Sequence, residues 1–247
     1  RCSFHNVDKP DTVRIMPPVI TTIGHAGSNS YGQRGSAGIP DVSSGNQSFT
    51  SSGTFTLQSG VHYNNLIFRV YGAGGSGGGG NRATIKSGSS NGAAGNDGGL
   101  SSVAKAGITT IQGNGGSGAA FRSDNVGGGG TASGGDTNTT GSSGGGNSGA
   151  SGGAGGDPGG TGETGYNSGR GGGGAGGTGS GDNNPQGGDG GGGGGFAKKT
   201  FSDFDGDGSS YTITVGTGGA ATAATSGLGD SSKGQAGEDG FVYVEFN

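Results

Sequence analysis

The sequence has few of the side chains from which an ordinary protein core is built. Only 25% of its 247 residues are hydrophobic, 6% are aromatic, and tryptophan is absent. No run of 18 or more apolar residues occurs, which argues against a transmembrane helix. The single cysteine, Cys2, excludes a disulfide framework within one chain.

Charged and catalytic residues are scarce as well. The 13 lysines and arginines against 17 aspartates and glutamates leave a formal net charge of -4, which argues against a basic nucleic-acid-binding surface. His5, His25 and His62 do not have metal-ligand spacing with one another or with the cysteine. A catalytic site needs clustered titratable groups, and the centre of the chain is nearly free of them. We therefore expect no enzyme activity, no cofactor and no metal.

Glycine is what the chain has in abundance. Of its 71 glycines, 53 lie among the 124 residues from Gly72 to Gly195. Such a composition alone favours disorder, because little apolar surface is available to offset the entropy of ordering the backbone. A flexible Gly/Ser linker therefore stays an alternative for this block.

Recognisable strands flank the glycine-rich block on both sides. Period-two alternation of aromatic and β-branched residues predicts strands in Phe49–Leu57 and Leu66–Tyr71 before the block, and in Tyr211–Val215 and Phe241–Phe246 after it. A disordered tail needs no strands on either side. We therefore expect the flanks to pair and to hold the glycine block between them.

Two regular structures could account for the block itself. A collagen triple helix needs glycine at every third position and abundant proline, but the row from Gly153 to Gly165 breaks at Ser168 and the block has only Pro158 and Pro185. A bundle of polyproline-II-type helices needs only short rows, such as Gly173, Gly176 and Gly179, and backbones that come close enough to hydrogen-bond. The second structure fits the low hydrophobicity better.

The predicted fold is therefore mostly irregular and β. It is a layered bundle of glycine-rich polyproline-II-type helices, framed by short strands, with few or no α-helices. Residues 1–45 are predicted to be an amino-terminal connecting or attachment segment, and residues 46–247 one glycine-rich domain. Within that domain we expect strands at about 46–71 and 210–247 and the glycine layer with its polar loops at about 72–199.

Polar loops interrupt the glycine runs, and loops on a rigid scaffold are where binding residues tend to lie. Tyr166 is either an exposed contact or a ring folded against the sheet, since the two look alike in sequence. The arginines are either contacts or solvated charges. The candidate binding residues are Arg82, Arg122, Asn125, Asn138, Tyr166, Asn167, Arg170, Asn183 and Asn184.

One acidic segment has partial metal-binding character. Asp203, Asp205 and Asp207 with Gly208 match the first half of an EF-hand calcium loop. The twelfth position, however, is Thr214 in place of the bidentate glutamate, and a strand replaces the expected helix. A polar turn before the strand is the competing interpretation.

Four segments resemble the glycine-rich tips of tailed-phage tail fibres, in particular the distal adhesins of T-even-like phages. They are Phe68–Gly80, Gly190–Ala197, Tyr211–Gly219 and Gly237–Phe246. The resemblance implies a sandwich of polyglycine helices whose loops bind a receptor on the bacterial surface, either an outer-membrane protein or a glycan. It also implies a place at the distal end of an extracellular fibre, without membrane insertion.

The amino end departs from the T-even pattern. The aromatic attachment segment expected there is absent from Arg1–His5 and from Ile15–Pro18. We therefore expect the chain to be the carboxyl-terminal part of a fibre protein, held by a shaft or by sister chains. Two rival functions stay open: a filament or matrix protein assembled through glycine layers, and an ice-binding protein, for which the threonines at 137, 139 and 140 are too few and too local.

Overall fold

Alternating hydrophobic residues build the longest strands of the protein. The computed structural model describes residues 38–84, 88–90, 92–120, 125–148, 150–166, 169–181, 185–223 and 232–247, and no helix occurs among them. The strands are β1 (Gly45–Phe49), β2 (Gly53–Thr56), β3 (His62–Tyr71), β4 (Arg82–Thr84), β5 (Gly88–Ser90), β6 (Ser101–Ala104), β7 (Ile111–Gly113), β8 (Ala132–Ser133), β9 (Thr137–Thr139), β10 (Ser180–Gly181), β11 (Phe196–Asp205), β12 (Ser210–Thr214) and β13 (Phe241–Phe246).

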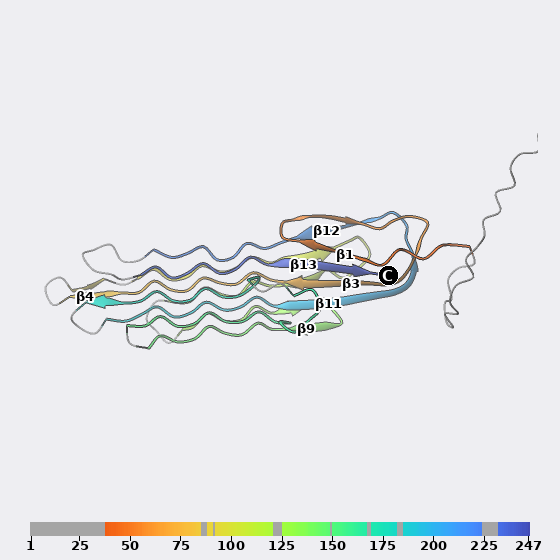
Figure 1. Ribbon diagram of the computed structural model, residues 1–247. Helices are drawn as coiled ribbons and strands as arrows, with labels where there is room; N and C mark the ends of the chain where they lie inside the picture. Colours follow the sequence, from red (N-terminus) through yellow and green to blue (C-terminus); the bar gives the residue numbers. More distant parts are fainter. Residues whose placement is uncertain are drawn as a thin grey trace, which may run out of the picture. The chain divides into compact units, whose positions relative to one another are not determined.

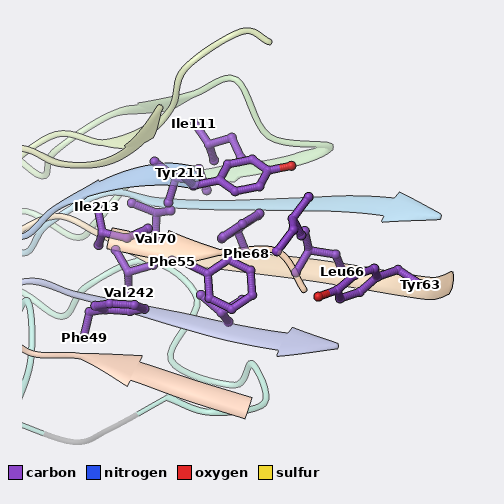
Figure 2. Close-up of a cluster of buried hydrophobic side chains, with 14 of the residues drawn as sticks. Phe49, Phe55, Tyr63, Leu66, Phe68, Val70, Ile111, Tyr211, Ile213 and Val242 are labelled. Carbon is purple, nitrogen blue, oxygen red and sulfur yellow. The ribbon is translucent and has the colours of Figure 1, made fainter. Parts of the chain in front are cut away.

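Two five-stranded antiparallel sheets face each other as a sandwich. Their strand orders are β1-β13-β3-β11-β9 and β2-β12-β6-β7-β8. On β3, Leu66, Phe68 and Val70 are fully buried between the sheets, as their shared parity predicts. The Phe68 ring lies 5.8 Å from the Phe55 ring and 4.8 Å from the Tyr211 ring of the second sheet (Figure 2). Burial of each such side chain contributes about 1.5 to 3 kcal/mol.

The segment Phe49–Leu57, expected as one strand, is two strands in different sheets. Phe49 ends β1 in the first sheet, and Phe55 lies in β2 of the second sheet. The chain turns between them, so both aromatic rings enter the same core from opposite sides. The alternating pattern marked the buried residues correctly, but it could not show the turn.

Ten extended glycine-rich segments form a bundle beside the sandwich. Eight of them are joined to strands of the two sheets with at most one residue between, and Figure 1 shows the segments running side by side. The segments are 72–81, 92–100, 114–120, 125–131, 141–147, 152–158, 171–179, 186–195, 216–223 and 232–240.

Segment 72–81 lies at the centre of one half of the bundle and donates hydrogen bonds in three directions. Successive backbone N–H groups reach 186–195, then 92–100, then 232–240, and the order repeats every three residues at distances of 2.8 to 3.2 Å. Three residues per turn without internal hydrogen bonds is the geometry of polyproline II. The segment therefore engages every one of its backbone N–H groups with a neighbouring segment.

Each of two interior segments has six hydrogen-bonded neighbours. Segment 72–81 also accepts hydrogen bonds from 114–120, 171–179 and 216–223. The second interior segment is 186–195, whose neighbours are 72–81, 114–120, 125–131, 141–147, 152–158 and 171–179. Six neighbours around each centre is the hexagonal packing of parallel rods, and it explains how eight of the ten segments enclose the other two.

Close packing of this kind requires glycine. A Cβ built on Gly74 would lie 1.8 Å from the carbonyl oxygen of Gly172, and one built on Gly190 would lie 1.8 Å from that of Ala154. Both carbonyls belong to backbone that neighbouring segments hold in place. The glycines are thus the cause of the packing and not a sign of flexibility.

The expected mostly irregular and β fold, with few or no α-helices, is confirmed for the described residues. The hydrogen bonds of the block run within one chain, so neither a collagen triple helix nor a free linker describes these segments. The structure also adds strands within the block: β6 to β9 are short and lie where the bundle segments enter the sheets, and β4, β5 and β10 form a separate small sheet.

Candidate recognition surface at the end of the glycine bundle

All outgoing bundle segments turn back at the end remote from the sandwich. Segment 72–81 leaves β3 and 92–100 returns to β6, and the same path is repeated by four further pairs of segments. Figure 1 shows the strand label β4 at this far end, away from β3, β11 and β13. The described ends of all five connections therefore lie at one end of the bundle, which we call the tip, while parts of the connections themselves lie outside the described residues. Loops gathered on a rigid scaffold form a typical recognition surface.

Asn81 fastens three segments at the base of the tip. Its side-chain Oδ1 accepts a hydrogen bond of 2.7 Å from the N–H of Gln186, and its own N–H donates to the Gln186 carbonyl at 2.9 Å. Its carbonyl accepts from the N–H of Ser180. The side chain is only 1% exposed, and its Nδ2 has no partner among the described residues. A buried amide of this kind fixes where the turns begin.

Further polar side chains tie the segment ends together. Asn147 donates its N–H to Oδ1 of the buried Asp189 at 2.9 Å, and its Nδ2 donates to the Gly187 carbonyl. Across the bundle, the Thr178 N–H donates to Oγ of Ser232 at 2.6 Å. At the end of the bundle a segment no longer has neighbouring segments on all sides. These side-chain hydrogen bonds take the place of the missing backbone hydrogen bonds. They make the base of the tip rigid.

The predicted binding residues fall at two different places. Arg82 begins β4, which pairs with β5 and with β10 in the small sheet at the tip. Asn125 is exposed, and its carbonyl accepts the N–H of Ala120 across a tip connection. Arg122, Asn167, Asn183 and Asn184 lie outside the described residues.

The other three predicted residues lie where the bundle meets the sandwich. Asn138 is exposed in β9, and its side-chain amide bonds the N–H and the carbonyl of Gly135. Arg170 lies 3.7 Å from the carboxylate of Asp239. Tyr166 is half-buried, with its ring 5.6 Å from that of Tyr71 and 6.5 Å from that of Phe241. The structure therefore separates these residues from the tip.

An ionic cluster next to Tyr166 holds the connection 159–170 on the outer face of the first sheet. Oε2 of Glu163 lies 3.0 Å from Nζ of Lys198 and 3.5 Å from Nε of the buried Arg69. The hydrogen bond from Lys198 is the main cause that lowers the pKa of Glu163 below its usual value. Arg69 also bonds Glu245 at 2.9 Å and lies over the ring of Tyr243. No sequence pattern marks this cluster, because its members are distant in the chain.

The acidic residues at the end of β11 and in the turn after it form ion pairs and hydrogen bonds within the protein. Asp205 lies 2.8 Å from Nδ1 of His62, and Asp203 lies 3.3 Å from its Nε2. Asp207 accepts hydrogen bonds from the N–H and hydroxyl of Ser209. Within the described ranges, no three acidic, histidine or cysteine side chains are grouped to hold a metal ion. The alternating aspartates therefore act as a strand end and a turn in this structure.

No protein family, curated protein or solved structure matches the chain. No helix suited to crossing a membrane is found in the part of the chain that the structure describes.

Proposed function

We propose that the protein is a tail-fibre tip adhesin of a phage, which binds a bacterial surface receptor through the connections at the tip. The observation that carries the proposal is the gathering of five connections at one end of a backbone-bonded bundle. The interior segment 72–81, with every N–H engaged, leaves little freedom at the base of these connections. Such preorganisation lowers the entropy cost of binding.

We propose that the sandwich end, opposite the tip, is where the protein is attached to a shaft or to sister chains. The described chain begins at residue 38, and the N–H of His62 in β3 donates to the Pro40 carbonyl at the sandwich. The entering chain and the tip are therefore at opposite ends of the described unit. This polarity suits a protein that is held at one end and presents the other. Several copies on one virion would add avidity.

The proposal is tested by the binding of labelled protein to intact bacteria of candidate hosts. In the tip variant, residues 121–124 and 182–184 are replaced by Gly and Ser, which leaves the anchor Gln186 in place. The control variant, Asn138→Ala with Arg170→Ala, changes exposed or half-exposed residues at the sandwich end. We expect the tip variant to lose binding to a host that the wild type and the control variant bind.

Two outcomes would contradict the proposal. Binding that survives in the folded tip variant but disappears in the control variant would move recognition to the sandwich end. Self-assembly into fibres without binding to any host would favour the rival function, a structural filament or matrix protein assembled through glycine layers.

A further inference from the structure

A cavity of about 440 Å³ opens at the sandwich, between the second half of β11, the start of β12 and the turn after β6. A site of this volume is in the range that small-molecule ligands occupy. The lining residues on which the site depends are Lys105, Lys199, Phe201, Phe204, Asp207 and Tyr211. None of these residues belongs to the tip.

Aromatic rings form one wall of the cavity. The Phe204 ring is stacked on Tyr63 at 5.2 Å with an interplanar angle of 7°, and it is only half-buried. Phe201 packs edge-on against Phe68, which fixes its position from the core side. The rings that line the cavity are thus held rigidly from behind. A flat ligand can stack on them without reordering the protein.

Charged groups on the rim are already matched in pairs. Nζ of Lys105 lies 3.6 Å from Asp207 and 5.0 Å from the centre of the Tyr211 ring. Nζ of Lys199 lies 2.5 Å from Asp136, and Asp205 lies against His62. Both signs are present and neither is in excess, so the rim offers donors and acceptors without selecting a charged ligand.

We propose that this cavity binds one or two rings of a neutral saccharide. A pyranose has a C–H face that stacks on an aromatic wall, and hydroxyls that both donate to carboxylates and accept from ammonium groups. Thr200 and Ser202 add hydroxyl groups to the same wall. An anion or a cation would have to displace one partner of an existing ion pair. The site is distinct from the tip and does not depend on receptor binding there.

The test uses saturation-transfer NMR on the full chain with three neutral probes: methyl glucoside, methyl galactoside and N-acetylglucosamine. Glucuronate and glucosamine serve as charged comparisons. We expect a neutral probe to bind with a dissociation constant of about 1 mM or tighter. The variant Phe204→Ala removes the stacking ring and should weaken binding about tenfold.

A second variant keeps the test decisive if the loss of Phe204 disturbs folding. Asp207→Asn removes an exposed carboxylate and leaves Lys105 without its carboxylate partner, so the neutral probe should bind several-fold more weakly and glucuronate more tightly. The matched control Asp157→Asn, on the exposed side of the bundle, should change neither. The absence of binding by all neutral probes at millimolar concentration, or tighter binding of a charged sugar to the wild type, would overturn the proposal. Unchanged binding in the folded Phe204→Ala and Asp207→Asn variants would do the same.

Discussion

At Gly74 and Gly191 the absence of a side chain determines how closely the bundle segments approach. A Cβ on Gly74 would lie 1.8 Å from one backbone oxygen, and a Cβ on Gly191 would lie 2.2 Å from the Gly75 carbonyl oxygen. Neither contact can be relieved by rotating a side chain, because both neighbours are backbone. A single methyl group must therefore separate two segments and stretch several hydrogen bonds at once.

We expect Gly74→Ala and Gly191→Ala each to lower the free energy of unfolding by about 3 kcal/mol or more. Gly146→Ala is the matched control, since Gly146 is exposed and its added Cβ would meet nothing within 4 Å. That control should change the stability by less than about 1 kcal/mol. Denaturant unfolding measures all three, and equal effects at the three positions would contradict the packing that we describe.

His62 is the residue at which pH should act on stability. The hydrogen bond to Asp205 is the main cause that raises its pKa above the usual value of 6.5, aided by the negative charges of Asp205, Asp203 and Asp41, while burial opposes the shift. The protonated imidazole therefore gains partners on folding. Its contribution is fully present below about pH 6.5 and is lost as the pH rises through the raised value.

We expect the stability of the wild type to fall as the pH rises above about 6.5 through the raised pKa of His62, and that of His62→Gln to fall less. Denaturant unfolding at several pH values checks the slope, and NMR titration of the imidazole checks the pKa directly. A folded-state pKa of His62 at or below 6.5 would contradict this interpretation.

Among the elements, the connection 159–170 contains Tyr166, a residue for which the sequence allowed two interpretations. Tyr166 was expected either as an exposed contact or as a ring against the sheet. Its half-buried ring packs at a tilt against Tyr71 and Phe241, which supports a structural contribution. A role of Tyr166 in receptor binding stays a prediction. Glu163 next to it anchors the same connection through Lys198.

We expect Tyr166→Ala to lower the unfolding free energy by about 1 to 2 kcal/mol, because the ring contacts and part of the apolar burial are lost. Tyr166→Phe keeps the ring and should stay within about 0.5 kcal/mol of the wild type. Thermal unfolding of the two variants separates the packing of the ring from any role of its hydroxyl. A wild-type melting temperature for Tyr166→Ala would show that the ring contributes no stability.

The strands differ in how well a periodic sequence pattern predicts them. Strand β12 was predictable, because Tyr211 and Ile213 alternate with exposed residues. The alternation of hydrophobic and polar residues is less regular in β11, since Lys198 and Lys199 are adjacent. In the structure, Asp203 also adopts a φ of 57°, which interrupts the alternation of side chains between the two faces. The short strands β6 to β9 have two to four residues each, too few for a periodic pattern. Their pairing depends on partners that are distant in the sequence.

On the scale of the whole chain, composition predicted the kind of structure but not its arrangement. Low hydrophobicity with abundant glycine pointed to backbone-bonded layers, and the described segments form them. The separation of Asn138 and Tyr166 from Asn125 was not predictable, because it depends on which connections lie at the tip and which at the sandwich. Buried polar residues such as Asn81 interrupt the glycine runs, and such an interruption marks in the sequence where a bundle segment ends.

The central claim is that the glycine-rich block is a hydrogen-bonded lattice that holds the tip, and amide hydrogen exchange tests it most directly. We predict slow exchange for every amide from Gly72 to Asn81, since each donates to a neighbouring segment. In the peripheral segment 125–131, Gly127 and Gly130 donate to 186–195 and should exchange slowly, with faster exchange at Gly128 and Gly129. Uniformly fast exchange across both segments would contradict the account, because it would describe a flexible linker.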